Sequence, residues 1–150
     1  MTLRFSTAIA ALAAVSLAIP VVARDHNELN GTRTLVPARS DFAGQPVVQT
    51  GTVTIADRDG IIIVSRNFVY EGAAETYFYR DVTDSEHGET FHSGKDLKSR
   101  TTWDKDVLKV TTTDSGAVTV ESYSLAPDGT MLVSVVRPAR EPFTLVFRRT

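Results

Sequence analysis

The 150-residue chain has no cysteine, a single tryptophan, only three histidines and no large excess of either charge. Without cysteine the protein forms no disulfide, and it offers no thiolate for a zinc site, an iron–sulfur cluster or nucleophilic catalysis. A formal net charge of -2 leaves no surplus of cations to displace the counterions of phosphate groups, so nucleic acid is not an expected partner. The remaining composition is that of an ordinary globular domain.

Long hydrophobic runs are also scarce. The longest extends from Ala8 to Ile19, which is shorter than the ~20 residues that span a bilayer. Arg4 precedes the run and small residues lead up to Ala23, a pattern typical of a signal peptide. We therefore expect a signal peptide over residues 1–23, cleaved near Ala23, and one mature domain over residues 24–150. The destination would be the bacterial periplasm or the medium, with no integral membrane span.

The mature chain shows no helical periodicity, and its polar start, Arg24–Asn30, is expected to be frayed. Short β-branched and aromatic runs are separated by turn residues such as Asp59-Gly60. The polar segment Val82–Leu97 is expected to form a long loop with one short strand. The other expected strands are Thr32–Val36, Val47–Ile55, Ile61–Tyr70, Glu75–Asp81, Ser99–Asp104, Val107–Thr113, Val118–Leu125, Met131–Arg137 and Phe143–Arg149.

This succession of about nine strands joined by short turns predicts an all-β fold. Consecutive antiparallel strands can each pair with their neighbour, which favours a single up-and-down β-barrel over a Greek-key sandwich. Closing the barrel also removes the exposed edges that would template aggregation.

The stretch Leu29–Val36 is similar to the Gly-x-Trp first strand of the lipocalin-like (calycin) barrels. The spacing of Gly44-Gln45-Pro46, of Thr52–Ile55 and of the hairpin Ala126–Met131 resembles small exported bacterial domains of that type. Arg33 stands where the family has the tryptophan that plugs the closed end of the barrel. The resemblance covers most of the chain from residue 29 to residue 149 and implies a barrel with an internal cavity for a small apolar ligand. It implies no reaction.

Aromatic residues recur at alternating positions of the expected strands, where they could form the wall of a ligand cavity. The same pattern is also typical of an ordinary barrel core. Arg66 shares its strand face with Phe68 and Tyr70; if that face points inward, the cation needs a buried partner or a ligand carboxylate, and if it points outward it is solvated. The candidate ligand-binding residues are Arg66, Phe68, Tyr70, Tyr77, Tyr79 and Trp103.

The histidines offer the remaining chemistry. His87 and His92 lie close to Glu86 and Glu89 in the long polar segment, and imidazole with carboxylate could bind a divalent metal or serve acid–base catalysis. A solvated acidic loop explains the same residues, and we predict no metal, cofactor or catalytic site. No Gly-x-Ser-x-Gly elbow is present for a serine hydrolase.

Together these patterns predict an exported barrel that binds a small hydrophobic or aromatic ligand, with the aromatic face lining the cavity and Arg66 as its polar anchor. The alternative is an envelope protein-interaction scaffold that presents the 82–97 loop and has no small-molecule ligand. We expect a monomer or weak dimer, and an enzyme is the less favoured class.

Overall fold

The computed structural model describes residues 26–82, 88–92 and 95–150 of the chain. It contains two short 3-10 helices, η1 (Asn27–Leu29) and η2 (Pro37–Arg39), and is otherwise built from strands. The strands are β1 (Gly31–Leu35), β2 (Thr50–Arg58), β3 (Ile61–Tyr70), β4 (Ala73–Val82), β5 (Gly88–His92), β6 (Lys95–Asp104), β7 (Val107–Asp114), β8 (Ala117–Leu125), β9 (Met131–Val136) and β10 (Phe143–Arg149).

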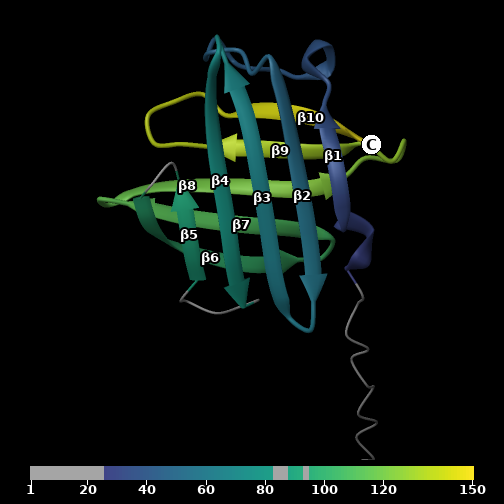
Figure 1. Cartoon of the computed structure of the whole chain (residues 1–150), viewed down its shortest axis with the longest axis vertical. Helices are drawn as coiled ribbons and strands as arrows, with labels where there is room; N and C mark the ends of the chain where they lie inside the picture. Colours follow the sequence, from purple (N-terminus) through teal and green to yellow (C-terminus); the bar gives the residue numbers. More distant parts are fainter. Residues whose placement is uncertain (1–25, 83–87, 93–94) are drawn as a thin grey trace, which may run out of the picture.

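Every strand pairs antiparallel with its neighbours in the sequence, and β1 also pairs with β10, so the sheet closes on itself as a barrel. In the closing ladder Arg33 lies opposite Arg149, and Leu35 lies opposite Phe147. Figure 1 shows β2 to β4 crossing in front of β7 to β10 at a steep angle, so that the barrel is flattened into two layers. The predicted up-and-down antiparallel barrel is confirmed.

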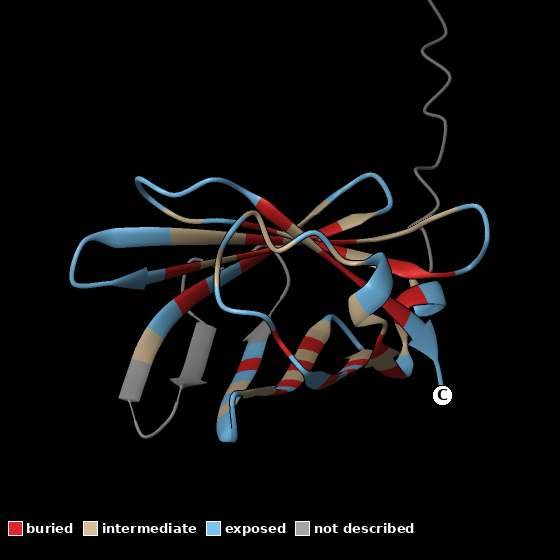
Figure 2. Cartoon of the chain, turned by 90° about the horizontal axis from the view of Figure 1, so that it is seen from above, coloured by how far each residue is buried: buried red, intermediate tan, exposed pale blue. Residues whose placement is uncertain are grey.

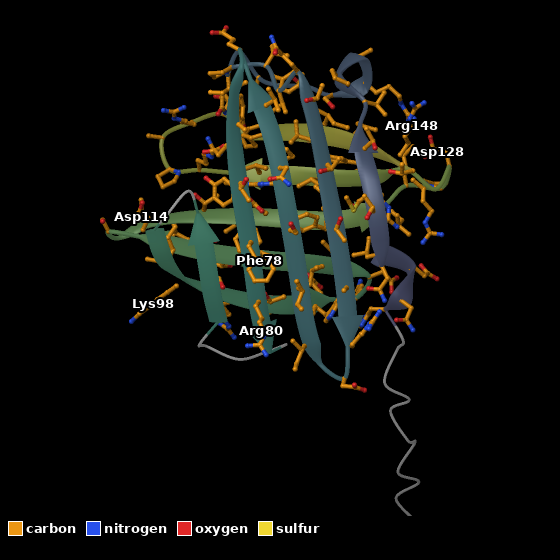
Figure 3. The ribbon with its side chains drawn as sticks, in the orientation of Figure 1. Phe78, Arg80, Lys98, Asp114, Asp128 and Arg148 are labelled. Atoms are coloured by element: carbon orange, nitrogen blue, oxygen red, sulfur yellow. The ribbon has the colours of Figure 1, made fainter. Side chains whose placement is uncertain are left out.

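The core lies between the two layers, where the inward side chains of alternating residues are buried (Figure 2). On β2 the buried residues are Gly51, Val53 and Ile55, and the threonines between them are exposed. This is the period-2 pattern expected of a strand with one face toward a core. The outer face is polar apart from scattered apolar side chains such as Phe78, which lies on β4 with Arg80 (Figure 3).

Because the strands alternate in direction, the connections alternate between two ends of the barrel. One end, called the mouth end below, carries the 36–49 loop, the β3–β4 turn at residues 71–72 and the β9–β10 loop at residues 137–142. The other, called the η1 end, carries η1, the β2–β3 turn at residues 59–60 and the β6–β7 turn at residues 105–106. The expected turn Asp59-Gly60 is present, with positive φ at both residues.

Two expectations need correction. The polar start of the mature chain was expected to be frayed, but residues 27–29 form η1 because Leu29 is buried against the core. The second strand begins at Thr50 rather than Val47, since Val48 is buried outside any strand as part of the 36–49 loop.

The tenth strand belongs to the polar segment expected to be a loop with one short strand. That segment contains β5 and the first residues of β6, and the two strands pair from Gly88 with Ser99 to His92 with Lys95. Residues 83–87 and 93–94 lie outside the described residues, and so does the predicted signal peptide, which stays a prediction. No helix of the described part of the chain is long and apolar enough to cross a membrane.

Candidate functional site

A buried ion pair lies in the barrel interior. Arg66 on β3 and Glu121 on β8 come from the two different layers and form a hydrogen-bonded ion pair, with 2% of each residue exposed. Tyr123 Oη donates to the second carboxylate oxygen of Glu121 at 2.7 Å. The Arg66 side chain therefore points inward and finds a protein partner, as a buried cation requires.

Aromatic rings surround the Arg66 guanidinium. Its Cζ lies 4.0 Å from the centroid of the Tyr77 ring and 4.8 Å from that of the Phe68 ring, distances at which a cation is attracted to the ring face. Burial opposes the charge of Arg66, but the Glu121 carboxylate raises the pKa of Arg66 well above its usual value. The Arg66 Nε is the one buried donor of this group without an acceptor among the described residues.

The neighbouring tyrosines are neutral at physiological pH. Burial raises the pKa of Tyr79 and of Tyr123 well above the usual value for tyrosine, and the nearby Glu121 carboxylate acts in the same direction. Burial also raises the pKa of Tyr77 to about 12. The charges within this group of side chains are therefore those of Arg66 and Glu121, which cancel.

A hollow of about 470 Å³, called the mouth hollow below, lies at the mouth end between the 36–49 loop, the β3–β4 turn and the β9–β10 loop. Its volume lies in the usual range for small-molecule sites. The apolar part of its wall consists of Phe42, Pro46, Val48, Tyr70, Ala73, Ala74 and Phe143, and the polar part consists of Gln45, Glu75, Arg137 and Arg140.

Arg137 follows the last residue of β9 and is half-buried in the wall of this hollow. Its Cζ lies 5.5 Å from the centroid of the Phe143 ring. Among the side chains that the structure describes, its guanidinium has no ion-pair or hydrogen-bond partner. Arg137 also lines a second hollow of about 190 Å³ that is bounded by Tyr77, Tyr79 and Glu121. It thus stands between the mouth hollow and the ion pair of the interior.

Glu75 is the acidic residue of the mouth hollow, and it is already partnered. Tyr77 Oη donates to Glu75 Oε1 at 3.5 Å, and Tyr70 lines the same hollow as this carboxylate. Burial and the Glu75 carboxylate raise the pKa of Tyr70. With Arg137 and Arg140 against Glu75, the charged residues that line the mouth hollow sum to +1.

The η1 end is closed from within by Arg33. Its side chain is buried, and it donates to the main-chain oxygens of Leu29 and, at 2.8 Å, of Glu28. Burial and the nearby Arg149 lower the pKa of Arg33. These hydrogen bonds hold η1 across the end of the barrel.

A third hollow, of about 570 Å³, lies beside η1 and is called the η1 hollow below. One wall is a stack of His26 on Trp103, whose ring centroids are 3.8 Å apart with an angle of 7° between the planes. His26 Nε2 lies 3.0 Å from the Lys105 main-chain oxygen. Glu28 and Asp106 add two carboxylates to the lining.

The structure brings together five of the six predicted ligand-binding residues. The Arg66 guanidinium contacts the rings of Phe68 and Tyr77. Tyr79 stacks on Tyr77 with 6.0 Å between ring centroids, and Tyr70 meets Phe68 edge to face at 6.4 Å. Trp103 does not join them, because it lies in the η1 hollow. Trp103 therefore lies at the η1 end of the barrel, away from the other five residues. The alternation along a single strand does not reveal this placement.

Two charged residues of the interior were not among the predicted site residues. Glu121 is the partner of Arg66, and Arg137 lies at the mouth. A signal for Arg137 exists in the sequence: it continues the alternation Met131, Val133, Val135, all three of which are buried. Glu121 shows no such signal, because Val118 and Val120 on the opposite face of β8 are equally apolar in the sequence.

The predicted histidine chemistry falls mainly outside the described residues, which exclude His87 and the side chain of His92. Among the side chains that the structure describes, no group of three or more His, Cys, Asp or Glu residues could hold a metal ion. The metal or acid–base hypothesis for His87 and His92 is therefore untested.

No family model and no curated protein matches the sequence of this chain. Solved structures with the same architecture do match. A REP1-NXSQ fatty acid transporter is 18% identical, with a TM-score of 0.62 over 82% of this chain and 96% of its own. A variant of the fluorescent protein UnaG is 17% identical, with a TM-score of 0.63 over 83% of this chain and 97% of its own. The chain therefore shares the β-barrel fold of these two proteins.

Proposed function

We propose that this protein binds a small hydrophobic or aromatic ligand, which enters through the mouth hollow and contacts the aromatic residues beneath it. The observation that carries the proposal is the mouth hollow itself, whose apolar wall of Phe42, Val48, Tyr70 and Phe143 leads to the ring cluster around Arg66. An apolar recess with a few polar groups is the usual form of a small-molecule site. The fatty acid transporter that shares the fold makes the same ligand chemistry reasonable here.

The polar side chains at the centre of the barrel restrict the chemistry of the ligand that the interior can bind. The Arg66–Glu121 pair is neutral as a whole, and Tyr79 and Tyr123 stay protonated, so the interior offers hydrogen bonds without a net charge. The proposed polar anchor is therefore the Arg66–Glu121 pair with its tyrosines, and no free cation is part of it. Phe68, Tyr70, Tyr77 and Tyr79 form the proposed apolar contacts, and Trp103 is not among them.

Titration with Nile red, an uncharged dye that fluoresces in apolar surroundings, tests the proposal. We expect saturable binding of one dye per chain, and we expect Val48→Asp to weaken it at least tenfold because a carboxylate would then stand in the apolar wall. Val118→Asp is the matched control, since Val118 is exposed on the outer face of β8 and should leave dye binding unchanged.

Absence of saturable binding by the folded protein, with no displacement by lipids or aromatics either, would refute the carrier proposal. The scaffold hypothesis, in which residues 82–97 contact a partner protein, would then become the leading one. Export of the chain and its monomeric or weakly dimeric state stay predictions.

A further inference from the structure

We infer that the ligand is an amphipathic anion, whose charged group is held by Arg137 at the mouth while its apolar part points inward. This inference rests on the proposed function and adds the chemical class and the orientation of the ligand. The arginines that face the barrel interior or its mouth differ in whether they already have polar partners.

The cation deep in the interior is already neutralised. Arg66 forms an ion pair with Glu121, and the rings of Tyr77 and Phe68 cover its guanidinium. A carboxylate brought to this point would lie beside the buried Glu121 carboxylate, where like charges repel strongly because the surroundings are apolar. The single donor left over, Arg66 Nε, does not offset a second buried anion.

Arg33, the buried arginine of the η1 end, is not available either. It donates to the main-chain oxygens of Leu29 and Glu28 and so holds η1 in place. The η1 hollow beside it is lined by Glu28 and Asp106, and their two carboxylates disfavour an anion there.

Arg137 differs from both. It is half-buried, its guanidinium rests on the Phe143 ring, and it has neither an ion pair nor a hydrogen bond among the described residues. Arg140 adds a second cation to the same wall, while Glu75 accepts a hydrogen bond from the Tyr77 hydroxyl. Asp114, which lines the smaller neighbouring hollow, is exposed and accepts a hydrogen bond from Ser115.

A guanidinium binds a carboxylate, sulfate or phosphate group in a forked geometry. A ligand anchored in this way keeps its charge near solvent and buries only its apolar part. This arrangement avoids the cost of transferring an ionised group into the barrel interior.

The test compares dodecanoate with dodecan-1-ol, which share an apolar chain and differ in charge, as competitors of bound Nile red at pH 8. We expect Arg137→Gln to weaken dodecanoate about tenfold and dodecan-1-ol less than twofold. Arg137→Lys, which keeps the charge, should retain dodecanoate affinity within about threefold. Arg148→Gln removes the same charge from the exposed end of β10 and should change neither affinity.

The outcomes separate the two proposals. If Nile red binds but Arg137→Gln weakens both competitors equally, or weakens neither, the anionic anchor is refuted and the apolar carrier stands. The same holds if dodecanoate does not displace the dye at all. If neither the dye nor either competitor binds the folded protein, the carrier proposal itself fails. Thermal melting of each variant shows that the comparison is made between folded proteins.

Discussion

The mouth hollow and the η1 hollow lie at opposite ends of one barrel and differ in charge and in construction. Arg137 and Arg140 against Glu75 make the mouth hollow cationic, whereas Glu28 and Asp106 make the η1 hollow acidic. Each end contains a buried or half-buried arginine, but these arginines differ in their partners. Arg33 at the η1 end is held by main-chain oxygens, and Arg137 at the mouth has no polar partner among the described residues.

This difference separates an arginine that stabilises the barrel from the arginine that we propose for binding. Where an arginine is buried with its acceptors, it fixes a helix onto the barrel and the end is closed. Where an arginine is half-buried without acceptors, it adds little to stability, and its guanidinium is available for the ligand that we propose. The buried Arg66–Glu121 pair lies between the two ends and is neutral as a whole.

The largest effect is expected from breaking that central pair. Glu121→Leu should lower the free energy of unfolding by about 3–5 kcal/mol, because it leaves Arg66 as an uncompensated buried cation. The double variant Arg66→Met/Glu121→Leu should recover most of the loss, since both charges are then replaced by apolar side chains of similar volume. Urea denaturation measures both values. Equal losses in the single and double variants would contradict the view that the cost comes from the unpaired charge.

A smaller effect is expected from one substitution made at each end. Arg33→Ala should lower the free energy of unfolding by about 2–3 kcal/mol, because it removes charge-assisted hydrogen bonds to two main-chain oxygens, of Leu29 and Glu28. Arg137→Ala should cost less than about 1 kcal/mol, since it removes only the contact with the Phe143 ring. Urea denaturation again provides the measurement. Similar losses at the two ends would show that Arg137 has a structural role like that of Arg33.

The smallest effect concerns Trp103, the single tryptophan of the chain. Because Trp103 lies in the η1 hollow, its fluorescence reports on that end of the barrel and not on the mouth. Saturating dodecanoate should leave its emission maximum unchanged, because the proposed ligand does not touch that end of the barrel. His26→Ala, which removes the stacked ring, should change the emission without any ligand. Strong quenching of Trp103 by dodecanoate would place the ligand at the wrong end for our proposal.

The sequence predicts the barrel well because strands and hairpin turns can be recognised from short stretches of sequence. Alternation along β2 and β3 and turn residues such as Asp59-Gly60 identify strands and hairpins without reference to the rest of the chain. The pattern is weakest at the polar segment between β4 and β6. The sequence predicts one short strand there but not its bounds or the early start of β6, because neither stretch shows apolar alternation.

The site is predicted less completely, because it depends on contacts between distant strands. Arg66 and Glu121 are 55 positions apart in the sequence, and no local pattern around either residue predicts the contact between them. The alternation of β9 does place Arg137 on the inner face, but whether an inward arginine is satisfied depends on what faces it from other strands. The alternation along its strand predicts Trp103 as one of the candidate ligand-binding aromatics. Alternation alone does not show at which end of the barrel a residue lies.

The ladder between β1 and β10 also bears on how the chain could be rearranged. Thr150 N donates to the Thr32 oxygen at 3.3 Å, and Arg149 Nη2 donates to the Asn30 oxygen at 3.0 Å, so the last residues lie beside the first strand. A short linker could join the end of β10 to the start of β1, and the exposed Asp59-Gly60 turn could supply new termini. Such a circular permutant would keep every strand pair, because the barrel depends on the order of strands around its axis and not on where the chain begins.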